Sequence, residues 1–62
     1  MTAADYRLAL VQLGLTQASA AEFLGVSLRT SHGYANGEPV PEAVAKLLLL
    51  MCRHSIRPSE LA

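Results

Sequence analysis

The chain has 62 residues, 52% of them hydrophobic, and its five lysines and arginines balance its five aspartates and glutamates. This length fits one small domain, in which roughly 60% of the unfolded surface becomes buried, and no apolar run approaches the roughly 18 residues of a membrane span. A single cysteine excludes an intramolecular disulfide. We therefore expect one domain over residues 1–62 with no membrane association. Since no basic-then-apolar segment opens the chain, we expect a cytoplasmic location.

The first predicted element is a helix over residues 3–13. Thr2 can cap its first turn, and Asp5 follows three residues later as the partner in a short capping box. Gly14 is placed to end the helix. The apolar residues that share one face at helical spacing are Tyr6, Ala9, Leu10 and Leu13. This pattern predicts an amphipathic helix with that face toward the core.

Two short helices joined by a tight turn are predicted within residues 16–37. Thr16 can cap the first helix, Gly25 breaks it, and Ser27 can cap the second. Gly37 can end the second helix in the left-handed conformation. The residues predicted to face inward are Ala20, Ala21 and Leu24 on the first helix, Val26 in the turn and Tyr34 on the second. Small Ala21 falls where two crossing helices come closest, which is the spacing of a helix-turn-helix.

The last predicted helix spans residues 41–54. Pro39 and Pro41 indicate an extended linker before it, because a residue that precedes proline avoids the helical region. Pro41 also suits the first turn of a helix. The stripe predicted to face the core consists of Val44, Leu47, Leu48 and Met51.

This last helix is apolar on more than one side. A helix that is apolar nearly all round is usually buried all round, which a domain of this size cannot achieve alone. We therefore expect part of it to pack on a second copy, forming a homodimer. The residues predicted for that interface are Leu49, Leu50, Cys52 and Ile56.

The order and spacing of these signals resemble the phage-repressor and Cro type of helix-turn-helix proteins. The matching residues are Leu15-Thr16-Gln17, Ala21, Gly25-Val26-Ser27, Arg29-Thr30, Asn36-Gly37 and the linker and helix of residues 38–48. The resemblance implies an all-α domain of four to five helices that binds double-stranded DNA as a homodimer and regulates transcription. It implies no cofactor and no small-molecule ligand. Two positions differ from the family: Ser31 replaces a branched apolar core residue, and Gly33 replaces a polar or basic residue that faces DNA.

The predicted DNA-binding residues follow from this motif, whose second helix lies in the major groove with its first residues at base edges. They are Thr16, Gln17, Ser27, Leu28, Arg29, Thr30, His32 and Asn36. Arg29 is the main candidate for reading a base, because a guanidinium can bond guanine O6 and N7 together; a phosphate clamp or a solvated arginine is the alternative. Leu28 could contact a thymine methyl or pack on the first helix. His32 could donate to DNA or stay exposed, and the resemblance places Gln17 on a phosphate.

Among the features of this sequence, the zero net charge agrees least with DNA binding, because DNA-binding domains usually carry a basic patch. Binding would then depend on a few well-placed groups, with a weak sequence-independent component. The alternative function is a protein-interaction or antitoxin-like module on the same scaffold. We expect neither enzymatic activity nor a metal site, because His32 and His54 lie on different predicted helices. Cys52, in an apolar helix, fits a core or interface residue better than a nucleophile.

Overall fold

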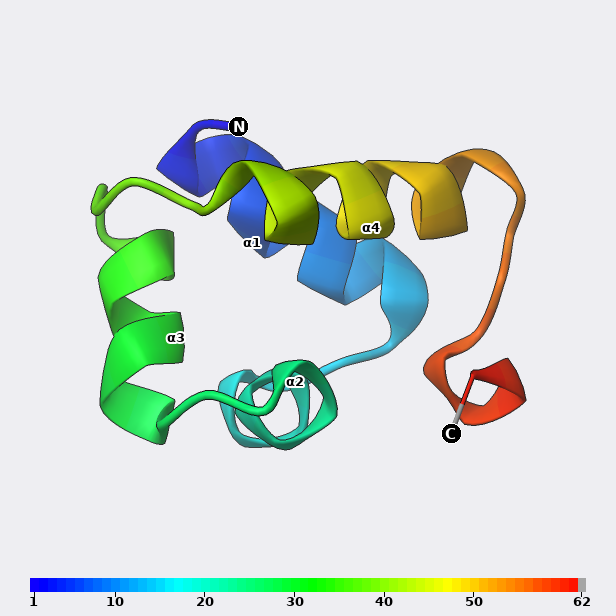
Figure 1. Ribbon diagram of the computed structural model, residues 1–62, viewed down its shortest axis with the longest axis horizontal. Coiled ribbons are helices and arrows are strands. Elements are labelled where there is room, and N and C mark those ends of the chain that lie inside the picture. The colour runs from blue at the N-terminus through cyan, green and yellow to red at the C-terminus, as the bar shows by residue number, and fades with distance from the viewer. Residues whose placement is uncertain (62) are drawn as a thin grey trace.

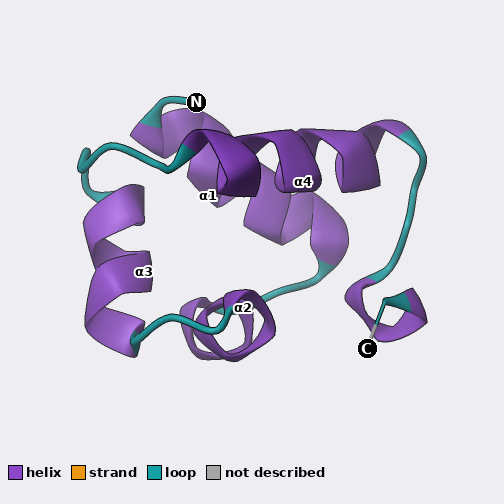
Figure 2. Ribbon diagram, viewed as in Figure 1, coloured by secondary structure: helices purple, strands orange, loops and turns teal. Residues whose placement is uncertain are grey.

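The computed structural model describes residues 1–61, and all of its regular structure is helical (Figures 1 and 2). Its elements are α1 (Ala3–Leu13), α2 (Gln17–Leu24), α3 (Leu28–Ala35), α4 (Glu42–Arg53) and a 3-10 helix (Pro58–Glu60). The described part of the chain has no strand, which confirms the all-α prediction. The predicted bounds of the first helix are also confirmed. The last long helix starts at Glu42, after Pro41 as its N-cap.

Side-chain hydroxyls begin the first three helices, as predicted. The Thr2, Thr16 and Ser27 hydroxyls accept from the backbone N–H groups of Asp5, Ser19 and Thr30, each at 3.1 Å. In α1 the bond is reciprocated, because the Thr2 backbone N–H donates to the Asp5 carboxylate at 3.2 Å. This bond and the Thr2 hydroxyl lower the pKa of Asp5 below its usual value. These caps satisfy N–H groups that have no partner inside the helix.

Left-handed backbone follows the α-helices. Helix α3 ends at Ala35 with Asn36 as its C-cap at φ −110°, and the glycine predicted to end it, Gly37, comes next with a positive φ. Gly25 after α2 has φ 73°, and the next N–H, of Val26, donates to the Ala21 carbonyl at 2.9 Å. Glycine adopts this conformation without a side-chain clash. The end of α4 has the same closure, with the Ile56 N–H 2.9 Å from the Met51 carbonyl oxygen, but Ser55 occupies the left-handed position at φ 53°. Ser55 is the one non-glycine residue with positive φ in the described chain.

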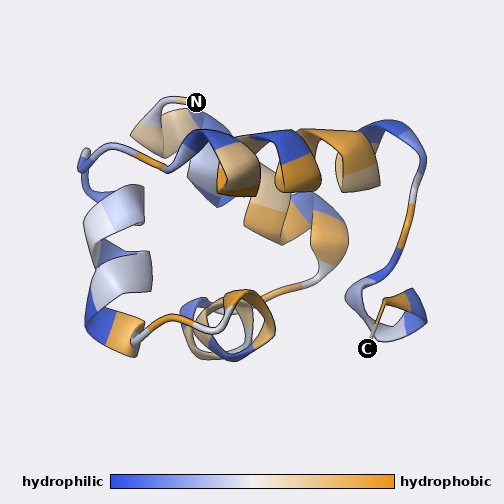
Figure 3. Ribbon diagram, in the orientation of Figure 1, coloured by the Kyte–Doolittle hydropathy of each residue, from blue (hydrophilic) through white to orange (hydrophobic). Residues whose placement is uncertain are grey.

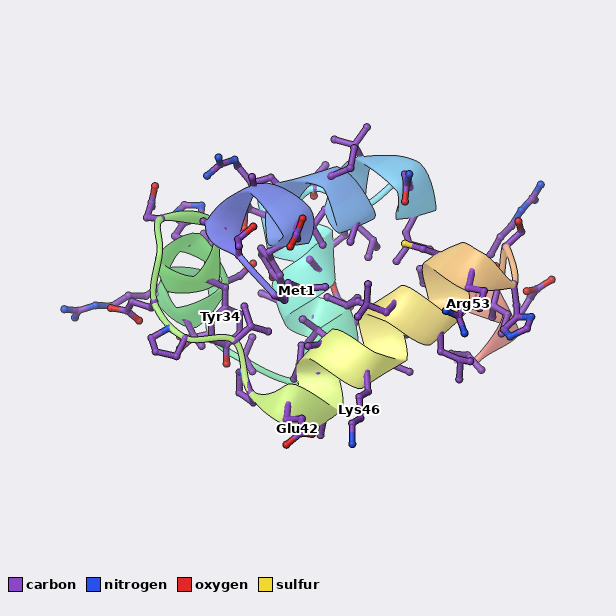
Figure 4. All side chains as sticks on the ribbon, turned by 90° about the horizontal axis from the view of Figure 1, so that it is seen from above. Met1, Tyr34, Glu42, Lys46 and Arg53 are labelled. Carbon is purple, nitrogen blue, oxygen red and sulfur yellow. The ribbon has the colours of Figure 1, made fainter. Side chains whose placement is uncertain are left out.

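The helices pack in a chain of contacts, in which α2 packs on α3, α3 packs on α1, and α1 packs on α4. In Figure 1, α1 and α4 lie along one side of the molecule, α3 stands at one end, and α2 is seen end-on at the bottom. The main buried cluster consists of Tyr6, Ala9, Leu10, Ala20, Tyr34, Ala35 and Leu48, and Ala21, Ala45 and Met51 are also buried. The rings of Tyr6 and Tyr34 meet edge to face at 5.5 Å between centroids, and Tyr34 points inward from α3 (Figure 4). The predicted inward face of α1 and the inward alanines of α2 are therefore confirmed.

Several large apolar side chains stay exposed. On α4, Leu48 and Met51 are fully buried, but Leu49 and Leu50 are 57% and 51% exposed. Figure 3 shows the apolar colouring of the carboxyl-terminal half of α4. On α1, Leu8 and Val11 are 56% and 74% exposed, which the sequence pattern did not single out. Within residues 1–61, no helix has both the length and the apolar character needed to cross a membrane.

Candidate nucleic-acid interface

Helices α2 and α3 form one packed unit joined by the residues Gly25, Val26 and Ser27. Ala21 on α2 is 4% exposed, so a small side chain does lie at the buried side of this unit. Figure 1 shows α2 end-on while α3 lies in the plane of the view, so the two helices lie across each other. The turn and the two caps fix the direction in which α3 leaves α2.

Ser31 anchors α3 to both neighbouring helices through its hydroxyl. Its side chain is fully buried, and its Oγ lies 2.7 Å from Tyr6 Oη of α1. It also donates to Gln17 Oε1 of α2 at 2.6 Å. A buried hydroxyl is costly only when it lacks partners, so the serine at this core position is satisfied. The sequence reasoning did not identify this network, although a polar residue at a core position signals a need for partners.

Arg7 provides a second attachment for α3. Its guanidinium Nη1 donates to the carbonyl oxygen of Ala35, the last residue of α3. A cation at the carboxyl end of a helix complements the helix dipole. The buried side of α3 is thus held at its middle by Ser31 and at its end by Arg7. Sequence reasoning also missed this contact, because nothing near residue 7 indicates a partner 28 residues away.

Three side chains on the opposite side of α3 are exposed. Leu28 is 47% exposed, and Arg29 and His32 are also exposed. Their side chains make no hydrogen bond or ion pair with any residue from 1 to 61. Leu28 is therefore not a core residue, and its predicted contact with a thymine methyl stays a prediction. In Figure 3 the first turn of α3 has both apolar and strongly hydrophilic colouring, and the rest of the helix is mostly pale.

The remaining predicted DNA-binding residues have local partners. The hydroxyls of Ser27 and Thr30 lie 2.9 Å apart, and Thr16 bonds Ser19 within the cap of α2. Asn36 Nδ2 donates to the His32 carbonyl at 2.8 Å. These groups thus stabilise the ends of α2 and α3. Gln17 uses its Oε1 for Ser31, so its amide Nε2 retains two donor hydrogens for another partner.

Gly33 lies on the exposed side of α3, one helical turn after Arg29. A Cβ atom added there would lie 2.5 Å from Glu38 Oε2 and 2.9 Å from Glu38 Cδ. The Glu38 carboxylate therefore occupies the space in which a side chain at position 33 would begin. The backbone explains this placement, because the Glu38 N–H donates to the Gly33 carbonyl at 2.9 Å and brings the chain back over α3.

The electrostatics of this unit are nearly neutral. Between residues 16 and 37 the charged side chains are Glu22 and Arg29, both exposed. Lys46 is paired with Glu42 at 3.1 Å on α4, and Figure 4 shows this pair pointing away from the other helices. The candidate surface therefore has one cation at its centre rather than a basic patch.

The residues predicted for a homodimer divide into two groups. Leu49 and Leu50 are exposed on α4. Cys52 packs partly against the core of its own chain, with Sγ donating to the Ala9 carbonyl at 3.9 Å, and burial raises the pKa of its thiol. Ile56 is partly buried in an open groove that Leu13 and Leu15 also line. Leu49 and Leu50 therefore offer the larger apolar surface to a partner.

Two further observations concern metal binding and similarity to known proteins. Within residues 1–61, no three His, Cys, Asp or Glu side chains gather as metal ligands would. Comparisons with protein-family models, with curated proteins and with solved structures found no match for this chain. The functional interpretation therefore depends on the arrangement of α2 and α3 described above.

Proposed function

We propose that the chain is a helix-turn-helix protein that binds double-stranded DNA sequence-specifically and regulates transcription as a homodimer. The observation that carries this proposal is the exposed row of Leu28, Arg29 and His32. It lies on a helix whose opposite side is fixed to α1 and α2 by the hydrogen bonds of Ser31. A rigidly held helix with uncommitted side chains on its outer face suits insertion into a major groove.

In this proposal α3 reads the DNA sequence and α2 positions the helix. Arg29 bonds guanine O6 and N7, and Leu28 contacts a thymine methyl group. Gln17, at the first position of α2, donates its remaining amide hydrogens to a backbone phosphate. Because the hydrogen bond from Ser31 restrains Gln17, phosphate binding by α2 would also fix the position of α3 along the DNA.

The homodimer is proposed to form through the exposed leucines of α4. Leu49 and Leu50 are each more than half exposed, and removing them from water on dimerisation is favourable at about 25 cal/mol per Å² of apolar surface. A twofold dimer would present two copies of α3 to major grooves about 34 Å apart, on a roughly palindromic site.

Selection of bound sequences from a random duplex pool tests this function. We expect a fixed half-site repeated with inverted symmetry, and an affinity that falls steeply between about 50 mM and 200 mM salt. Light scattering of the free protein should give the mass of two chains. A protein that enriches no sequence and binds no duplex even at low salt would contradict the proposal.

A protein-interaction or antitoxin-like module is the second candidate. It is favoured by the exposed apolar residues on two helices, Leu8 and Val11 on α1 and Leu49 and Leu50 on α4, together with zero net charge. Exposed apolar surface often marks a protein interface. The salt titration separates the two functions, because an apolar interface does not weaken steeply as salt rises.

A further inference from the structure

We propose that Glu38 is a specificity-determining residue of the duplex-facing surface. Its carboxylate, which lies over Gly33, disfavours DNA in general and is tolerated where the nearest strand places the exocyclic amino group of a cytosine or adenine beside it. The inference rests on the proposed DNA-binding function. It assigns a role to a residue outside α2 and α3.

The position of the carboxylate is the first step. Gly33 and Arg29 are four residues apart on α3, so they are neighbours on its surface. Glu38 Oε2 lies 2.5 Å from the point where the Cβ of residue 33 would be. The carboxylate therefore replaces a side chain at position 33, next to the residue proposed to read guanine.

The charge of this group is uncompensated within the described chain. The ion pair found among residues 1–61 joins Glu42 to Lys46, and none of the side-chain hydrogen bonds among these residues involves the Glu38 carboxylate. A phosphate that approaches this surface meets an unpaired negative charge. Between residues 16 and 37, only Arg29 carries a full positive charge to offset it.

Selectivity follows from what a base edge can offer a carboxylate. Cytosine N4 and adenine N6 are the amino donors of the major groove, and glutamate is a known acceptor for the cytosine group. Guanine and thymine present acceptors at their major-groove edges, which repel a carboxylate. Because every base pair carries one such amino group, the selection is between the two strands: a cytosine or adenine on the strand nearest the carboxylate offers it a donor, whereas a guanine or thymine there offers acceptors.

The test compares Glu38→Ala with Glu42→Ala, each of which removes one exposed carboxylate. Alanine is used because glutamine could itself bond adenine. Both variants and the parent chain are titrated with a random-sequence duplex and with the duplex that the parent chain selects. We expect Glu38→Ala to tighten binding of the random duplex by about three- to tenfold at low salt, and that of the selected duplex by less than about twofold. Glu42→Ala should leave the ratio of the two affinities unchanged.

A repeated selection with Glu38→Ala should also lose enrichment for cytosine or adenine at one position of each half-site. If both carboxylate variants change the two affinities equally, net charge is the cause and Glu38 has no special role. If Glu38→Ala tightens both duplexes by the same factor, the residue repels DNA without selecting a base, and the proposal is overturned. A parent chain that selects no duplex would instead contradict the DNA-binding function itself.

Discussion

Tyr6 Oη and Ser31 Oγ lie 2.7 Å apart in the core, joining α1 to α3. Both side chains are fully buried, and the Ser31 hydroxyl also donates to Gln17 Oε1 of α2. Three helices therefore meet at one hydroxyl. The proposed DNA-reading helix is oriented by this polar contact, where a purely apolar core would specify its rotation less strictly.

Removing the Tyr6 hydroxyl should lower the free energy of unfolding less than removing the Ser31 hydroxyl does. Tyr6→Phe leaves the Ser31 hydroxyl bonded to Gln17, so we expect a loss of about 0.5–1.5 kcal/mol in the free energy of unfolding. Ser31→Ala leaves the Tyr6 hydroxyl buried without a partner, and should cost about 1–3 kcal/mol.

Urea denaturation of both single variants and of the double variant measures these costs. The double variant should be clearly more stable than the sum of the two losses implies, because it removes both members of the pair. Additive losses would show that the Tyr6–Ser31 bond contributes nothing specific.

Gly33→Ala should stabilise the protein. Gly33 is inside α3 and, unlike Gly14, Gly25 and Gly37, does not have a positive φ, so alanine gains about 0.5–1 kcal/mol of helix propensity. The atom that the new methyl meets is the end of the flexible Glu38 side chain, which can move aside at little cost. Gly14→Ala is the contrasting variant, because φ 71° strains any L side chain there. Thermal unfolding should give a higher midpoint for the first and a lower midpoint for the second.

The helices were predictable because their signals are local. Thr2 with Asp5, Thr16 and Ser27 all cap helices within three residues of their own position, and Gly25 ends α2 where it interrupts the apolar pattern. Signals that act over so few residues can be recognised in the sequence without knowledge of the fold. The same holds for the inward face of α1.

The attachments of α3 were not predictable, because they join distant parts of the chain. Ser31 bonds residues 25 and 14 positions away, and Arg7 reaches the carbonyl of Ala35. No local pattern links such partners. The Glu38 carboxylate lies over Gly33 only because the turn after α3 folds the chain back. The exposed α3 residues were predicted from the motif alone, and their role in binding stays a prediction.

Ser55→Gly should also raise stability. Ser55 holds φ 53° at the end of α4, a conformation that costs an L residue roughly 1–2 kcal/mol. Glycine removes this strain but adds freedom to the unfolded chain, so we expect a net gain of about 0.5–1 kcal/mol. Ser59→Gly, in the 3-10 helix and without a positive φ, is the matched control. Its unfolding midpoint should be unchanged or lower, and equal gains from both variants would rule out relief of strain at Ser55.

Asp5 should make the start of α1 sensitive to acid. The backbone N–H and the hydroxyl of Thr2 lower the pKa of this carboxyl in the folded state, whereas its unfolded value is about 3.9. The stabilising contribution is therefore complete above that unfolded value and is lost as the pH falls through the lower, folded pKa. An NMR titration should place the Asp5 midpoint below 3.9, and Asp5→Asn should flatten the dependence of the melting temperature on pH in this range. A midpoint at or above the unfolded value would contradict the capping box.

Arg29→Ala tests the proposed reading of DNA. The Arg29 side chain has no partner within the described chain, so its removal should leave the unfolding midpoint unchanged. If it bonds a guanine in the selected duplex, its loss should weaken that binding by about 1–3 kcal/mol and relax selection at one base position. If it clamps a phosphate, every duplex should lose affinity alike and the salt slope should fall by about one.

Arg57→Ala is the matched control for Arg29→Ala. Arg57 is the N-cap residue of the 3-10 helix, which Figure 1 shows at the end of the molecule opposite α3, and its replacement removes the same charge. Because exposed charges separated by more than about 10 Å are largely screened at 0.1 M salt, Arg57→Ala should change duplex affinity little. Equal losses from the two variants would mean that overall charge attracts the duplex, and would remove Arg29 from the proposed reading surface. A loss confined to Arg29→Ala, at one base position, would place the outer side of α3 against the bases.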